Sequence, residues 1–169
     1  MSACLVKISI GLLAVVLSVS ASAEPFDLPK LGVRFDRPPS DPPITPEIET
    51  VEFATIGLFY ANDTFFSIMR SNIDGSEAIP VSDPERQRQL LEAARASGVE
   101  VTKSGVTRFA GESAFYTVGT SKRDGNPNYQ YSLTLMKGGR TFRFTLVSRV
   151  GDPRENEAAM KLLNSASLE

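Results

Sequence analysis

The catalytic chemistry open to this chain is limited by the scarcity of two residue types, histidine and cysteine. The sequence contains no histidine, and its one cysteine is Cys4, near the start of the chain. Histidine is the commonest general base in enzymes, and histidine and cysteine supply the nitrogen and sulfur ligands of zinc and haem. For residues 24–169 the composition therefore excludes a Ser-His-Asp triad, a Cys-His dyad, a zinc site with nitrogen or sulfur ligands and a histidine-ligated haem.

Three other kinds of site remain open: a carboxylate pair for hydrolysis, a Ser-Lys dyad and a calcium site. The turn around Gly75 has oxygen ligands but lacks the ligand spacing and the twelfth-position glutamate of a calcium loop. Ser121 and Lys122 are neighbours on a predicted strand, so their side chains point to opposite faces. We expect no catalytic residue, no cofactor and no metal, and we keep a carboxylate-dependent hydrolase as the alternative of a different class.

Basic side chains are concentrated in one part of the chain. Residues 103–149 hold eight Lys/Arg and two Asp/Glu, a net charge of +6, whereas residues 24–102 hold seven against fourteen and residues 150–169 two against four. A clustered positive surface attracts anionic partners and raises their association rates. Without a partner, the same pattern means that basic and acidic segments face each other or are solvated separately.

Strand alternation indicates where this charge lies. In the predicted strand over residues 140–149, Arg143 and Arg149 alternate with Phe142, Phe144 and Leu146, which form the apolar side. One face of the sheet should therefore be core, and the other polar, basic and partly open to water. If this basic face is the site, its candidate residues are Arg143, Arg149, Lys122, Arg123 and Arg140.

The expected partner of such a face is an anionic protein, glycan or lipid head group. Proteins that bind single-stranded nucleic acid interleave cations with exposed aromatic side chains. Here the aromatic residues of the last strand lie on the side opposite Arg143 and Arg149. We therefore expect no nucleic acid partner.

The elements that must position these residues begin with strands. Residues 32–36 are predicted as a short edge strand, and the proline-rich residues 37–46 as a rigid surface connection, with a ligand for an aromatic groove as the alternative. Residues 53–60 and 64–71 are predicted as a hairpin around residues 61–63. Asn62 begins a glycosylation sequon there, but asparagine and aspartate also favour the turn itself.

Two helices are predicted from their caps. Ser82 and Glu85 have capping-box spacing, Asp83 before Pro84 is an alternative cap, and Gly98 ends the first helix. Leu90, Leu91 and Ala94 should be buried, and the charged residues should face water; these are Glu85, Arg86, Arg88, Glu92 and Arg95. The second helix begins at Asp152 and Pro153, and Ala159, Leu162, Leu163 and Ala166 should lie on the sheet.

Between the helices, the pattern predicts a meander of four strands over residues 99–109, 113–121, 129–136 and 140–149. Gly138 and Gly139 favour a tight hairpin, and residues 122–128 a longer loop. The predicted fold class is α+β: an antiparallel sheet made of a hairpin and a four-strand meander, with two helices packed on it. Residues 24–169 are expected to form one domain.

The first 23 residues are typical of a cleaved export signal. Lys7 precedes an apolar run from Ile8 to Val19, and the small residues 21–23 follow. About a dozen apolar residues are too few for a membrane span, which needs about twenty. The mature chain should begin at Glu24, carry no stable membrane anchor, form no disulfide, and be periplasmic or secreted.

These elements resemble the PsbP-like and DcrB-like α/β domains, which are frequent in exported or thylakoid-lumenal proteins. The resemblance covers most of residues 31–167 and rests on residues 32–35 (GVRF) followed by Pro38, residues 111–116 (GESAFY), residues 139–146 (GRTFRFTL) and a closing helix from Asp152 to Leu168. The proline-rich segment departs from the family, whose corresponding passage is short. The resemblance implies a PsbP/DcrB-like sandwich and a non-catalytic role in binding or assembly, without a shared active site to carry over.

Together these observations indicate an exported, non-catalytic binding or accessory protein of the cell envelope. The first alternative is an immunity or inhibitor protein that neutralises a toxin or hydrolase in the same compartment, with residues 122–128 as the inserted element. The hydrolase named above is the second.

N-terminal sequencing of the exported product tests the signal. We expect the sequence to begin at Glu24, because cleavage follows the small residues 21–23. Material that begins at Met1 and stays in the membrane fraction would contradict this prediction.

Overall fold

The computed structural model describes residues 25–36, 46–50, 52–58, 64–72, 79–123 and 125–169. The predicted export signal, Asn62 with its turn, the turn around Gly75 and all of the proline-rich segment except Pro46 lie outside these residues. Within them, no helix is long and apolar enough to cross a membrane.

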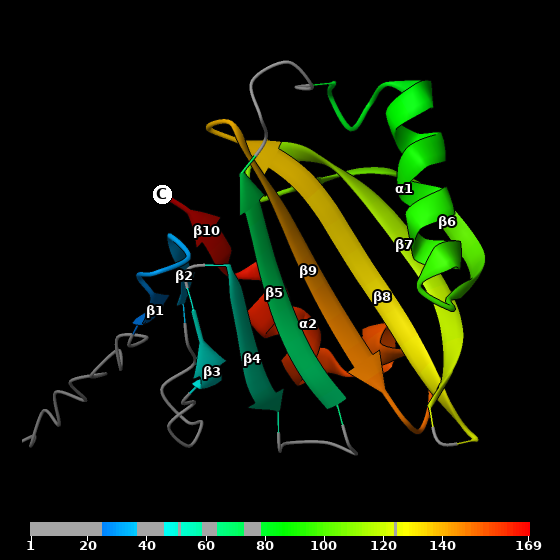
Figure 1. Cartoon of the computed structure of the whole chain (residues 1–169). Coiled ribbons are helices and arrows are strands. Elements are labelled where there is room, and N and C mark those ends of the chain that lie inside the picture. The colour runs from blue at the N-terminus through cyan, green and yellow to red at the C-terminus, as the bar shows by residue number, and fades with distance from the viewer. Residues whose placement is uncertain (1–24, 37–45, 51, 59–63, 73–78, 124) are drawn as a thin grey trace, which may run out of the picture.

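The described residues form ten strands, two α-helices and one 3-10 helix (Figure 1). The strands are β1 (Pro25–Leu28), β2 (Val33–Asp36), β3 (Pro46–Glu49), β4 (Phe53–Leu58), β5 (Thr64–Asn72), β6 (Glu100–Phe109), β7 (Glu112–Arg123), β8 (Asn126–Lys137), β9 (Arg140–Ser148) and β10 (Ala166–Leu168). The helices are α1 (Pro84–Ala96), the 3-10 helix η1 (Pro153–Glu155) and α2 (Glu157–Asn164).

Seven of the strands form one antiparallel sheet in the order β3-β4-β5-β9-β8-β7-β6. The predicted hairpin is β4 and β5, the predicted meander is β6 to β9, and β5 pairs with β9 to join the two. This arrangement confirms the predicted α+β fold class. β3, which the sequence did not predict, is an edge strand of this sheet.

The main core lies on one side of this sheet, which we call the inner face. Alternation places Phe66 of β5, Leu133 of β8 and Phe144 of β9 there, and each is almost completely buried. α2 covers this side, behind the sheet in Figure 1. Ala159, Leu162 and Leu163 are buried as predicted. Ala166 is also buried, but the expected closing helix ends at Asn164 and Ala166 begins β10.

A second, three-stranded sheet closes the core, in the order β1-β2-β10. The expectation that residues 32–36 form an edge strand is wrong, because β2 pairs with β1 on one side and β10 on the other. The chain returns after α2 so that Ala166 lies opposite Phe35. Phe35 packs edge to face on Phe66, with ring centroids 5.6 Å apart, and so ties the small sheet to the large one.

α1 packs on the opposite side of the large sheet, which we call the outer face (Figure 1). Asp83 caps the helix, since its Oδ1 accepts a hydrogen bond from Glu85 N at 2.8 Å, so the alternative cap and not the Ser82 box is used. Gly98 follows the helix with φ +83° and ends it as predicted. Leu90 is buried in a small cluster with Val81 and Phe115.

One charged residue of α1 departs from the prediction. Glu85, Arg88, Glu92 and Arg95 are exposed as expected, but Arg86 is half-buried. Arg86 lies four residues before Leu90, so both side chains are on the side of the helix that faces the sheet. The expectation that Arg86 faces water is therefore wrong.

Two of the three turns of the meander test the sequence predictions. Gly138 and Gly139 have φ +57° and +70°, as the predicted hairpin turn requires. The expected loop over residues 122–128 is wrong, because β7 and β8 stay paired as far as Arg123 opposite Asn126. Between these strands Gly125 has φ +80°, a conformation that glycine adopts without a steric penalty. Pro127 is tolerated because pairing with β9 ends at Tyr129, and β8 has only β7 beside it there.

Adjacent phenylalanines on β5 allow a matched test of the two faces. We expect Phe66→Ala to lower the free energy of unfolding by about 3–5 kcal/mol, because it leaves a cavity in the core. Phe65→Ala, on the outer face, should cost less than about 1 kcal/mol. Urea unfolding measures both, and equal losses would contradict this assignment of the faces.

Candidate functional site

The outer face carries polar side chains where the inner face carries the core. Three rows cross β5, β9 and β8: Met69, Arg143 and Thr134; Ser67, Thr145 and Ser132; and Phe65, Val147 and Gln130. None of these nine residues is acidic, and β5, β8 and β9 contain no Asp or Glu at all. The predicted polar, basic face is therefore this one.

A groove separates α1 from this face, with a cavity volume of about 120 Å³. Leu90, Ala94 and Ser97 of the α1 segment form one wall. The floor consists of side chains from β7, β8 and β9, mainly Thr117, Ser132, Thr134, Arg143 and Thr145. The groove thus has an apolar wall on the helix and a floor of hydroxyl groups around one guanidinium group.

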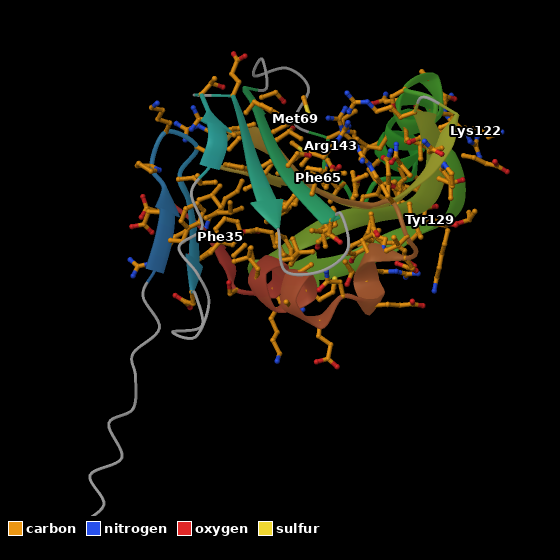
Figure 2. All side chains as sticks on the ribbon, turned by 90° about the horizontal axis from the view of Figure 1, so that it is seen from below. Phe35, Phe65, Met69, Lys122, Tyr129 and Arg143 are labelled. Atoms are coloured by element: carbon orange, nitrogen blue, oxygen red, sulfur yellow. The ribbon has the colours of Figure 1, made fainter. Side chains whose placement is uncertain are left out.

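Arg143 is the charged group of this floor. It is half-buried, and within the described residues it has no hydrogen-bonding or ion-pair partner. Burial lowers the pKa of Arg143 below its ordinary value, and the positive charge of Arg86 lowers it further. The group nevertheless stays protonated at neutral pH. In Figure 2 Arg143 and Met69 project on the side of the sheet that carries α1.

Arg86 approaches the same region from the helix. Its Nη1 donates a hydrogen bond to Gln89 Oε1 at 3.2 Å. Its Nε is buried and has no acceptor within the described residues. A buried donor without an acceptor costs about 1–3 kcal/mol. The charges of these two guanidinium groups act on each other, and neither group is paired with a carboxylate of the described chain.

The other predicted site residues do not join this pair. Arg149 follows β9, where its Cζ lies 5.8 Å from the centroid of the Phe65 ring. Arg140 is exposed at the start of β9 and, two residues before Phe142, lies on the inner-face side of the strand, opposite to Arg143. Lys122 and Arg123 are exposed near the tip of the β7–β8 hairpin. Lys122 is labelled there in Figure 2.

Sequence reasoning missed Arg86, which it assigned to the solvent. The signal was present in the helical spacing, because Arg86, Leu90 and Ala94 lie four residues apart and share a side of α1. The interpretation of Arg86 as a surface charge rested on residue type alone.

A second set of charged residues follows β9. A cavity of about 460 Å³ is lined by Asp152, Glu155 and Glu157, among others. Arg154 Nε donates to Asp152 Oδ1 at 3.0 Å and thereby lowers the pKa of this carboxyl. Glu155 and Glu157 are exposed, whereas a general acid that works near neutral pH needs burial. Within the described residues no group of three or more potential ligands is arranged to hold a metal ion.

The sequence and the structure were compared with those of known proteins. No protein-family model matches the sequence, and no curated protein matches it. Cyanobacterial PsbP (CyanoP) from Synechocystis sp. PCC 6803 has a similar structure, with a TM-score of 0.57 and 13% identity, covering 95% of this chain and 98% of that one. The chain has the Mog1p/PsbP-like fold. This confirms the resemblance to PsbP-like domains that the sequence indicated.

Two further structures share the Mog1p/PsbP-like fold. The Ran-binding protein Mog1p of Saccharomyces cerevisiae has a TM-score of 0.51 and 8% identity, covering 85% of each chain. A protein from Bacteroides thetaiotaomicron VPI-5482 has a TM-score of 0.57 and 11% identity over 88% of this chain, which spans 49% of that protein. At such low sequence identities the similarity supports the fold alone, so the function must be argued from the site.

The Asp152–Arg154 pair predicts a pH effect. Because the pKa of Asp152 is lowered in the folded state, its contribution to stability is present above the pKa of the unfolded chain. It is lost as the pH falls from about 4 through the lowered value. We expect Asp152→Asn to weaken the pH dependence of urea unfolding in this range. An acid profile identical to that of the unmodified protein would contradict the prediction, and Arg154→Gln should raise the pKa of Asp152 in a carboxyl NMR titration.

Proposed function

We propose that this protein is an exported, non-catalytic binding or accessory protein of the cell envelope, whose outer face binds an anionic partner. The observation that carries the proposal is Arg143, a half-buried guanidinium group without a partner among the described residues. Removing a charge from water is costly unless an opposite charge or hydrogen bonds offset the cost. An anionic group on a partner would provide both.

Apolar side chains beside Arg143 support a macromolecular partner. Phe65 and Met69 of β5 are 36% and 50% exposed on the same face. Protein interfaces combine such apolar or aromatic anchors with arginine at their centres. Arg149 above the Phe65 ring extends the positive charge toward the end of β9. The face thus offers an apolar strip flanked by two cations.

Fold and sequence are consistent with this role. Mog1p, which has the same fold, is a Ran-binding protein, so the fold is compatible with binding a protein partner. The envelope location rests on residues 1–23, which are typical of a cleaved export signal. An anionic protein, glycan or lipid head group in that compartment is the expected class of partner.

One observation favours the immunity or inhibitor function as a second candidate. Pairing of β7 with β6 ends at Thr120, and pairing of β8 with β9 ends at Tyr129. The β7–β8 hairpin therefore projects beyond its neighbours, with exposed Lys122 and Arg123 near its tip. A projecting basic hairpin is suited to insertion into an acidic cleft of a toxin or hydrolase.

Paired charge substitutions distinguish the two functions. A partner is first captured from periplasmic extract and identified, and its affinity for the purified protein is then measured at several salt concentrations. We expect Arg143→Gln with Arg149→Gln to weaken binding roughly tenfold or more and to flatten its salt dependence, because charged hydrogen bonds are lost. Arg140→Gln, on the same strand but opposite face, is the control.

Each outcome decides between the candidates. If Lys122→Gln with Arg123→Gln weakens binding and the Arg143 and Arg149 pair does not, the inhibitor function is favoured and the outer-face proposal is wrong. Unchanged affinity and salt dependence in both double variants would contradict both.

A further inference from the structure

The groove between α1 and the outer face has the chemistry of a site for a single group. Resting on the proposed function and deepening it, we propose that Arg86 and Arg143 clamp one oxyanion, a carboxylate or phosphate carried by the partner, in this groove. The partner is thereby recognised by one anionic group held between a helix and a strand, not by diffuse surface charge.

The two cations come from the two elements that bound the groove, β9 and α1. Arg143 belongs to the groove floor on β9. Arg86 lies one helical turn before Leu90, on the side of α1 that lines the groove through Leu90, Ala94 and Ser97. This placement agrees with the effect of Arg86 on Arg143, whose pKa is lowered by burial and further by the charge of Arg86. An oxyanion between them would contact both.

Neither cation is neutralised within the described residues. The acidic residues of α1 are paired elsewhere: Arg88 lies 2.6 Å from Glu85 and 2.8 Å from Glu92, on the exposed side of the helix. The strands of the floor carry no acidic residue at any outer-face position. The groove therefore holds excess positive charge that the chain itself does not balance there.

Hydrogen-bond donors complete the site. Ser132 and Thr145 share a hydrogen bond of 3.0 Å between their hydroxyl oxygens in the floor, which leaves one of the two hydroxyl protons to donate, and Thr134 is buried beside Arg143. The buried Nε of Arg86 is a further donor without an acceptor. Carboxylate and phosphate oxygens accept several such bonds at once, and arginine binds them through two parallel donors.

The size of the groove limits what enters it. Pockets for whole small ligands measure about 300–1,000 Å³. This groove, at about 120 Å³, has room for one functional group. The remainder of the partner would lie outside it, over the exposed Phe65 and Met69.

The like charges of Arg86 and Arg143 lead to a second expectation, which concerns the stability of the ligand-free protein. Two like charges in a half-buried site repel each other, so the unoccupied groove should be less stable than one with a neutral residue. We expect Arg143→Met to leave the melting temperature of the ligand-free protein unchanged or higher. An arginine with a purely structural role would lower it on removal.

Small anions test the site directly on the purified protein. Inorganic phosphate and acetate are the two probes, with sodium chloride at matched ionic strength as the control. We expect one or both probes to shift the side-chain Nε–H NMR signals of Arg86 and Arg143 but not that of Arg95, which is exposed on α1. At ten times its Kd the probe should raise the melting temperature by about 3–6 °C. A larger effect of phosphate indicates a phosphate-bearing partner, and a larger effect of acetate a carboxylate.

Substitutions locate the binding. Arg86→Gln and Arg143→Gln should each abolish the response to the probes, and Arg143→Lys should weaken it about tenfold because the planar fork is lost. Arg95→Gln on α1 and Arg140→Gln on β9 are the matched controls and should respond normally. The inference is wrong if chloride acts as well as the probes, if the two Nε–H signals do not move, or if the Arg86 and Arg143 variants still respond.

The test also separates this inference from the proposed function. If the double Arg143 and Arg149 variant loses its partner while phosphate and acetate leave the unmodified protein unaffected, the outer face binds the partner and the oxyanion site does not exist. If the probes bind and the partner's affinity is unchanged in that variant, the site exists and the proposed use of the outer face is wrong.

Discussion

The pairing of β5 with β9 is the constraint on which the rest of this structure depends. Nine antiparallel residue pairs, from Thr64 opposite Ser148 to Asn72 opposite Arg140, join the hairpin to the meander. Because side chains alternate along both strands, this one register sends Phe66 and Phe144 to the inner face and Met69 and Arg143 to the outer face. A slip of one residue would exchange the two sets and bury Arg143 in the core.

The two faces are covered unequally, and the outer face is polar as a result. On the inner face, rings from β2, β5, β9 and β6 follow one another in contact, and α2 and the three-stranded sheet exclude water from them. On the outer face, α1 buries a separate small cluster around Leu90 and Phe115. The groove is the space between this helix and a floor too polar to pack tightly against it. The alternation that builds the core thus also produces the candidate site.

An element could be predicted from the sequence where its local pattern of apolar and polar residues, caps and glycines was strong. The long strands β7, β8 and β9 have alternation over nine to twelve residues, and α1 has a cap, an apolar stripe and a terminal glycine, so each was predictable. β1, β3 and β10 have three or four residues each, too few for a period of two to stand out. β10 exists because it pairs with β2, more than 130 residues earlier in the chain. The β7–β8 turn was misjudged because residues 122–128 are a run of turn-forming types, of which several belong to the paired strands.

By itself the sequence determined the long strands and α1, the side of each of these strands that faces the core, the excess of positive charge in residues 103–149 and the absence of histidine- and cysteine-based chemistry after Cys4. These properties depend on composition and on neighbours a few residues apart. Only the tertiary structure decided which charges act on each other: Arg140 and Lys122 do not affect Arg143, whereas the charge of Arg86, 57 positions before it, lowers its pKa. The reason is physical, since the approach of Arg86 depends on how α1 crosses the sheet, and that crossing is set by the packing of Leu90 on Phe115.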